Sequence, residues 1–91
     1  MNRMNRIEIL NEAGRLINGE RDEIYGTPLV NHQRIALLWQ VVLGTEISPA
    51  EVAICMALVK VARLVQTPDH EDSFIDATAY MAIAGEVAAK G

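Results

Sequence analysis

Hydrophobic positions divide the chain into four segments with helical spacing, and no run alternates hydrophobic and polar residues as a strand does. The first segment has hydrophobic residues on one side and charged residues on the other, which predicts an amphipathic helix over about residues 5–18. Gly19 follows as a natural helix end. Residues 20–28 predict a loop or a frayed extra turn, because Gly26 permits a positive φ and Pro28 disfavours a helical residue before it.

The two middle segments are hydrophobic around almost their whole circumference. The first of them predicts a helix that begins between residues 29 and 31, with Asn31 as its cap, and ends at Leu43. The sequence Ser48–Glu51 is a helix start, because serine caps, proline tolerates the first position and glutamate completes a capping box. The helix that follows is expected to run to about residue 66, before Thr67-Pro68.

An acidic connector leads to the fourth segment, a helix expected from about residue 72 or 73 to residue 88. Its many alanines make it small-sided, which favours close approach of neighbouring helices. Four helices and no strand signal predict an all-α fold, a compact bundle of about four helices. At 91 residues the chain fits a single domain, residues 1–91.

Composition adds an expectation about assembly. Hydrophobic residues make up 51% of the chain and its mean hydropathy is +0.14. A small monomer has little interior in which to bury so many apolar side chains. The third helix is also too apolar, and the fourth too small-sided, for a solitary bundle. We therefore expect a homo-oligomer, a dimer or higher.

Charge and cysteine usage limit the partners and the compartment. The net charge of −4 argues against duplex nucleic acid as a partner, although a small phosphate ligand can still bind in a local basic pocket. The single cysteine, Cys55, excludes an intrachain disulfide and suits a reducing compartment. Residues 1–6 do not resemble a signal peptide, and the charge-free apolar segments 35–45 and 52–59 are too short to span a membrane. These features predict a cytoplasmic protein without a membrane partner.

Two cations interrupt the apolar third helix. Lys60 and Arg63 are the only charged residues from Val52 to Val65, and their spacing of three puts them on one face. One interpretation is structural: both cations pair with carboxylates or reach solvent along apolar stems. The other is a pocket for an anion, most naturally a phosphate.

The fourth helix carries polar residues at matching intervals. Asp72, Asp76 and Tyr80 are each four apart, so they share a face if the helix contains all three. Asp72 near the helix start is explained by capping, whereas Asp76 is not. A salt bridge from Asp76 to Lys60 or Arg63 is the contact we expect first.

Carboxylates elsewhere raise the question of a metal. Glu20 and Glu23 are three apart, and with Asp72 and Asp76 they form a candidate metal-binding set, provided that residues 20–23 are helical. Tyr25 precedes the loop glycine, and either packs on the edge of the core or stacks on a ligand ring.

Several motifs then carry a resemblance. They are Gly19-Glu20-Arg21, Tyr25-Gly26-x-Pro28-x-x-Asn31-His32-x-Arg34-Ile35-Ala36-x-Leu38-Trp39, Lys60-x-Ala62-Arg63-Leu64 and His70-x-Asp72-Ser73-x-Ile75-Asp76-x-x-x-Tyr80. Over nearly the whole chain they resemble a family of short phage and prophage proteins of unknown function. More distantly, the chain is similar to a phage domain associated with nucleotide modification and to the MazG-like all-α nucleoside triphosphate pyrophosphohydrolases.

The distant resemblance implies Mg²⁺ held on paired helices by Glu-x-x-Glu and Glu-x-x-Asp motifs. Residues 20–23 match the first motif, but the second is absent, since Asp72 and Asp76 are four apart. Three hypotheses follow, and whether the protein is an enzyme stays open. The chain hydrolyses a nucleotide with Mg²⁺, or it only binds one, or it is a structural or accessory phage protein. A non-enzymatic protein could act against host defence, as an oligomeric sponge for nucleotide immune signals or as a direct inhibitor. The expected ligand-binding residues are Tyr25, Lys60, Arg63, Asp76 and Tyr80.

Overall fold

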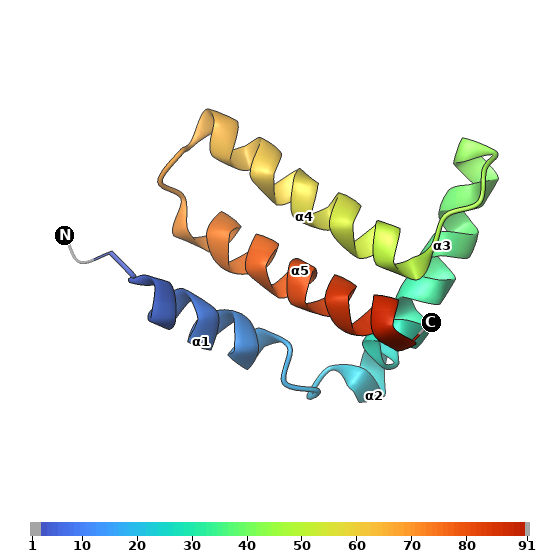
Figure 1. The fold of residues 1–91 in the computed structure, drawn as a ribbon, viewed down its shortest axis with the longest axis horizontal. Helices are drawn as coiled ribbons and strands as arrows, with labels where there is room; N and C mark the ends of the chain where they lie inside the picture. Colours follow the sequence, from blue (N-terminus) through green and yellow to red (C-terminus); the bar gives the residue numbers. More distant parts are fainter. Residues whose placement is uncertain (1–2, 91) are drawn as a thin grey trace.

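Five helices make up the computed structural model, which describes residues 3–90 (Figure 1). Four are long: α1 (Arg6–Leu16), α3 (Pro28–Leu43), α4 (Pro49–Gln66) and α5 (Glu71–Lys90). The fifth, α2 (Asp22–Tyr25), is a single turn, which confirms the extra turn expected between residues 20 and 28. There is no strand among residues 3–90. The all-α prediction with about four helices is therefore confirmed; of the expected domain, residues 1, 2 and 91 lie outside the described part.

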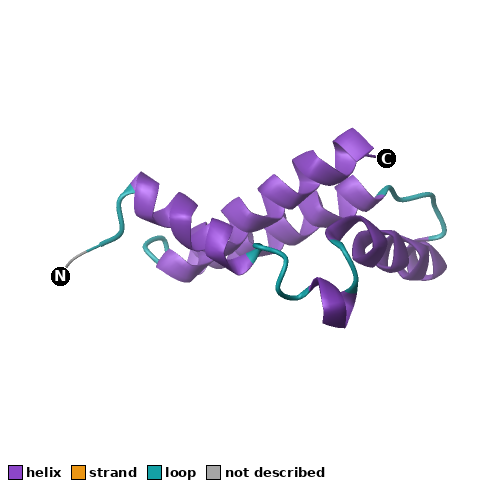
Figure 2. Ribbon diagram, turned by 90° about the horizontal axis from the view of Figure 1, so that it is seen from below, coloured by secondary structure: helices purple, strands orange, loops and turns teal. Residues whose placement is uncertain are grey.

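Three of the helices form a layer and the fourth crosses its end. Figure 1 shows α4 and α5 side by side in opposite directions, with α1 along the other side of α5. Helix α3 packs against both α4 and α5. It lies across the end of the layer, which Figure 2 shows from another side. The segment before α1 is held to the start of α5, because the Met4 backbone N–H donates to the Glu71 carboxylate at 2.8 Å. This layout brings the end of α1, the turn α2 and the start of α3 to one end of the layer.

The core is built mainly from small side chains. Ala13 of α1 packs with Ile75 and Ala79 of α5, while Val52 and Ala53 of α4 are completely buried. Alanines let helix axes approach closely, so the small-sided fourth helix predicted from the sequence became the centre of the layer. Few large side chains contribute to this core, and many large hydrophobic ones stay outside it.

Local signals decide where the helices begin. The Ser48 hydroxyl accepts from the Glu51 N–H and the Glu51 carboxylate accepts from the Ser48 N–H, so the capping box predicted for the third helix is confirmed. Those hydrogen bonds lower the pKa of the Glu51 carboxyl. The cap expected at Asn31 was wrong: Thr27 caps α3 instead, since Pro28 already occupies the first helical position. Proline there lacks only an N–H that would have stayed unpaired within the helix.

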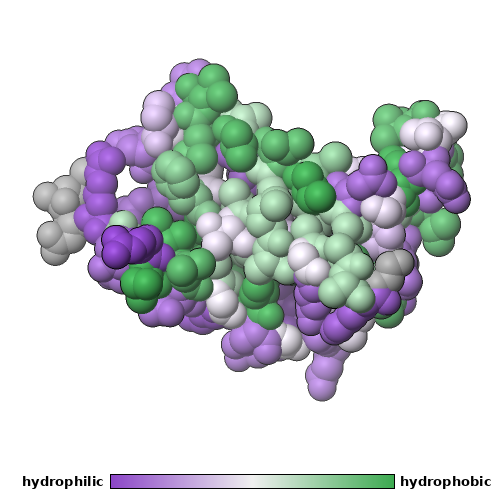
Figure 3. Space-filling view, in the orientation of Figure 1, coloured by the Kyte–Doolittle hydropathy of each residue, from purple (hydrophilic) through white to green (hydrophobic). Residues whose placement is uncertain are grey.

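The outside of the molecule keeps extensive apolar surface. Figure 3 shows hydrophobic side chains along α4 and at the free end of α3 (Figure 3). Val41 and Val42, in the second half of α3, are 82% and 84% exposed. Among the described helices none is both long enough and apolar enough to cross a membrane.

Candidate functional site

A cavity of about 350 Å³ opens where the end of α1, the turn α2 and the start of α3 meet the middle of α4 and α5. One wall is apolar, formed by Leu16, Ile17, Pro28, Ala79 and Ile83. Polar side chains converge from the other directions: Arg21, Asp22, Tyr25, Asn31, His32, Lys60, Asp76 and Tyr80. A concave site with an apolar wall and a few convergent polar groups is typical of small-molecule binding.

Four of the five residues predicted to bind a ligand line this cavity: Tyr25, Lys60, Asp76 and Tyr80. They come from three separate elements, so the fold has gathered residues that the sequence only suggested could meet. The fifth, Arg63, is exposed and does not line the cavity. One helical turn is 3.6 residues, so a residue three positions after Lys60 shares its side of α4 only in part.

A salt bridge between α4 and α5 lies in the cavity wall. The Lys60 ammonium approaches the Asp76 carboxylate at 3.3 Å, which confirms the contact expected first from the sequence. The Lys60 side chain is 15% exposed and that of Asp76 33%, so the pair is shielded but still reachable from the cavity. An ammonium has three N–H donors and a carboxylate has two oxygens, so one such contact leaves hydrogen-bonding capacity for a ligand on both sides.

His32 lines the cavity, although no functional role was predicted for it from the sequence. It is buried to 4% exposure, and its Nδ1 lies 2.7 Å from the Pro28 carbonyl oxygen. A carbonyl can only accept, so Nδ1 carries a proton and donates. The hydrogen bond fixes the ring, and Nε2 is then the ring nitrogen that a ligand can engage. The signal that could have found His32 is its position one helical turn after a helix-starting proline.

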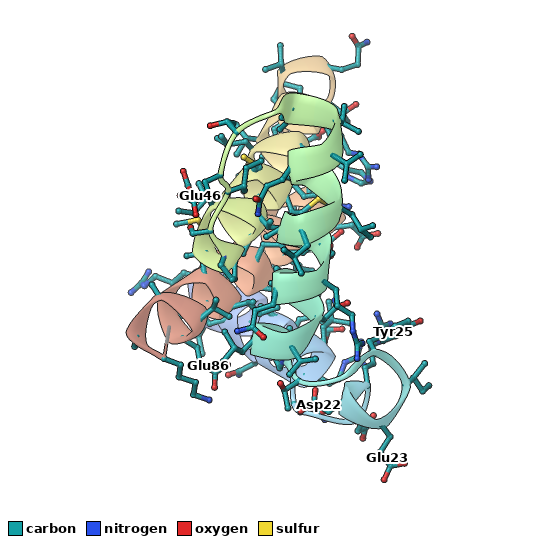
Figure 4. All side chains as sticks on the ribbon, turned by 90° about the vertical axis from the view of Figure 1, so that its right-hand side faces the viewer. Asp22, Glu23, Tyr25, Glu46 and Glu86 are labelled. Carbon is teal, nitrogen blue, oxygen red and sulfur yellow. The ribbon has the colours of Figure 1, made fainter. Side chains whose placement is uncertain are left out.

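The turn α2 decides which acidic and basic side chains of the 20–23 segment reach the cavity. Arg21 and Asp22 line it, whereas Glu20 and Glu23 are exposed and do not. In Figure 4 Glu23 points away from the body of the molecule (Figure 4). Successive residues of a helix are about 100° apart, so Asp22 and Glu23 cannot both face inward from a single turn.

The loop after α2 positions Tyr25 at the cavity. Gly26 has a φ of 84°, in the left-handed region that favours glycine, and its N–H donates to the Asp22 carbonyl at 2.8 Å. A Cβ on Gly26 would lie 3.3 Å from Val30 Cγ1, so a side chain there would be both strained and tight. Tyr25 is 52% exposed, which leaves part of its ring free to stack on a ligand.

The four carboxylates predicted to bind a metal are not brought together. Asp72 lines a separate, smaller hollow of about 240 Å³ with Glu12, Arg15 and Asp76, while Glu20 and Glu23 are at the other end of the layer. In that hollow Arg15 binds Glu12, and this contact lowers the pKa of the Glu12 carboxyl. Within residues 3–90 no three His, Cys, Asp or Glu side chains are grouped so as to hold a metal ion. The structure therefore does not gather Glu20, Glu23, Asp72 and Asp76 into one set of metal ligands, although Asp72 and Asp76 share the smaller hollow.

Comparison with known proteins adds a family and two viral relatives. The family described as a domain of unknown function, DUF6378, matches residues 8–88. The Gene 55 protein of Mycobacterium phage D29 is 50% identical over 72 residues, which cover 79% of this chain and 48% of the phage protein. The Gene 55 protein of Mycobacterium phage L5 is 38% identical over 78 residues, covering 85% and 50% respectively. The chain thus spans about half the length of these relatives, and no solved structure matches it.

Proposed function

The chain belongs to the DUF6378 family, as a phage protein of unknown function, and on that premise we propose that its cavity binds a nucleotide or another small phosphate ligand. The observation that carries the proposal is the convergence of Lys60, Tyr25 and Tyr80 from three elements on one cavity with an apolar wall. The proposed setting is the cytoplasm of the infected host.

Lys60 is the proposed phosphate-binding group. Its side chain is only 15% exposed, and a charge–charge contact shielded from water is stronger than one in water. Arg21 lines the same cavity and offers a second cation, with the planar donor geometry that suits phosphate oxygens. Asp76 holds Lys60 in position, and its other oxygen is an acceptor for a ligand hydroxyl.

The remaining cavity residues suit the rest of a nucleotide. Tyr25 and Tyr80 present aromatic rings for stacking on a base, and the wall formed by Ile17 and Ile83 accepts its apolar faces. His32 and Asn31 offer hydrogen bonds to base edges, which would give the site its selectivity.

We further propose that one chain binds this ligand without hydrolysing it. Hydrolysis with Mg²⁺ would draw on a cluster of carboxylates, and the acidic residues of residues 3–90 do not form one. Binding without turnover is what a sponge for nucleotide immune signals does, so an anti-defence role is the biological setting that we favour. If binding depends on Mg²⁺, we attribute that dependence to a metal ion carried by the ligand's phosphates and not to a metal site on the protein.

Calorimetric titration with a nucleotide panel tests the proposal. The panel holds mono-, di- and triphosphates and cyclic dinucleotides, each with and without Mg²⁺. We expect saturable binding to at least one of them, weakened at least tenfold, or about 1.4 kcal/mol, in Lys60→Met. Arg63→Met is the matched control, since it removes a cation from the same helix outside the cavity, and should change affinity less than about twofold.

Other results would contradict the proposal. No binding to any member of the panel would remove the nucleotide hypothesis, and equal losses in Lys60→Met and Arg63→Met would remove the cavity as the site. Release of pyrophosphate or phosphate by the wild-type protein, followed by ion chromatography, would show turnover and would reinstate the hydrolase hypothesis.

A further inference from the structure

Two neighbouring surfaces carry large exposed hydrophobic side chains. One is the C-terminal half of α3, where five such residues are 60–84% exposed, and the other is one side of α4, where four are 40–83% exposed. We call them together the α3–α4 face; it consists of Leu37, Leu38, Val41, Val42, Leu43, Ile54, Leu58, Val61 and Val65. Figure 3 shows both parts, the row along α4 and the free end of α3. Folded monomers rarely expose so large an apolar patch, so the face needs an explanation.

The spacing within α4 is that of a helix-packing seam. Ile54, Leu58, Val61 and Val65 follow one another at steps of four, three and four residues. That is the spacing of the a and d positions of a heptad, which lie in one row and pack against another helix. Within residues 3–90 the row stays 40–83% exposed, whereas Ala53 and Ala57, on another side of α4, are buried.

The face also lacks charge. No charged residue occurs in segment 35–45 of α3 and the following loop, or in segment 52–59 of α4. Further along α4, Lys60 lines the cavity. Arg63 is two positions from both Val61 and Val65, about 200° around the helix from that row. Depletion of charge distinguishes the buried centre of permanent interfaces, above all of homodimers, from the more polar surfaces of transient complexes. An uncharged face is complementary to a copy of itself, since no like charges meet.

The total exposed surface area indicates how large an interface the chain could form. The chain exposes 6452 Å², whereas a folded monomer of 10.0 kDa is expected to expose about 5,200 Å². The difference of roughly 1,200 Å² exceeds the about 800 Å² that each partner buries in an interface of standard size. The exposed surplus is therefore enough for a stable dimer.

We propose that a second copy of this chain covers the α3–α4 face in a two-fold dimer. In Figure 1 the C-terminal half of α3 diverges from α4. Each copy therefore has a projecting half-helix on α3 and an exposed row of hydrophobic residues on α4. The projecting half of α3 in each copy lies along the α4 row of the other, and the two-fold axis repeats the contact. The cavity is at the opposite end of α3 and stays accessible, so this proposal does not depend on the proposed function.

Sedimentation equilibrium of the full chain tests the dimer. We expect a mass of twice 10.0 kDa for the wild type at micromolar concentration. Val42→Asp and Leu58→Asp each bury a charge at the interface and should raise the dissociation constant at least a hundredfold. Ile24→Asp is the matched control, because Ile24 is a hydrophobic residue of α2, 75% exposed and outside the face, and it should leave the dimer intact.

Hydrogen exchange of the wild type supplies a readout that needs no variant. On dilution, amides of residues 37–43 should lose protection together, while those of the buried part of α5 keep theirs. A wild type that is still monomeric at about 100 μM, a hundredfold above the concentration at which we expect the dimer, would overturn the proposal, as would an open-ended assembly. Dissociation by Ile24→Asp to the same extent as by Val42→Asp would overturn it as well.

Discussion

The two halves of α3 have opposite surroundings, and the more apolar half is the one left exposed. The first half is packed against the layer, with His32 and Ala36 buried, and it lines the cavity. The second half carries Leu37, Val41 and Val42 at 66%, 82% and 84% exposure. The first half carries the polar run Asn31–Arg34, whereas Gln40 is the one polar residue of the second half, so hydrophobicity alone does not predict which half is packed. Burial depends on which helices the chain folds against each side.

This difference indicates that one helix serves two tasks. Its first half packs against the layer and lines the cavity of the proposed ligand site, while its second half is surface that we expect a second copy to cover. A substitution in the first half should act on folding or on the cavity. A substitution in the second half should act on assembly and leave the single chain folded.

The largest effect is expected from a charge in the first half. Ala36→Asp buries a carboxylate at a position only 3% exposed, and should reduce the free energy of unfolding by at least about 3 kcal/mol. Val42→Asp places the same charge at 84% exposure and should change it by less than about 0.5 kcal/mol. Urea unfolding followed by circular dichroism, at protein concentrations low enough for monomers, makes the comparison. Similar losses in the two variants would erase the distinction between the halves.

A smaller effect is expected at the cavity end. His32→Ala removes the hydrogen bond to the Pro28 carbonyl and empties a buried position, and should cost about 2 kcal/mol of stability. His32→Phe keeps most of the volume and should restore part of that stability without restoring ligand binding. Gln33→Ala, on the exposed side of the same turn, is the control. Recovery of binding in the phenylalanine variant would show that the ring only fills space.

The smallest effect concerns the start of α4, directly after the exposed half of α3. Hydrogen bonds with Ser48 lower the pKa of Glu51 below its ordinary value of 4.5. A group whose pKa is lowered by folding contributes stability above its unfolded pKa and loses it as the pH falls through the folded value. Below about pH 4.5 the wild type should therefore lose stability more steeply than Glu51→Gln, as thermal unfolding against pH would measure. If the stability of both proteins falls equally with decreasing pH, the Glu51 carboxyl makes no pH-dependent contribution to folding.

The sequence predicted the helices well because their signals are local. The capping box at Ser48 and Glu51, the glycine that ends α3 at residue 44, and the alanines of α5 each act within a few residues. The cap of α3 was mispredicted because Asn31 was considered without the stronger local pair Thr27 and Pro28.

The site was predictable only in part because it depends on packing between elements. Helical spacing on α5 indicated Asp76 and Tyr80, and charge in an apolar helix indicated Lys60. No spacing rule relates Arg21, Asp22 or His32 to those residues, since the turn α2 and the crossing of α3 bring them together. The metal set was proposed from the sequence motif at residues 20–23, but both of its glutamates are exposed, Glu20 before α2 and Glu23 within it.

Two-dimensional amide NMR of the wild-type chain during a nucleotide titration tests the central claim, that the first half of α3 lines a ligand site, most directly. With the best-binding nucleotide of the panel, we expect shifts in Tyr25, His32, Lys60 and Tyr80, and unchanged positions for Arg63 and residues 37–43. Shifts concentrated in residues 37–43, or spread evenly over the chain, would contradict a ligand site at the first half of α3.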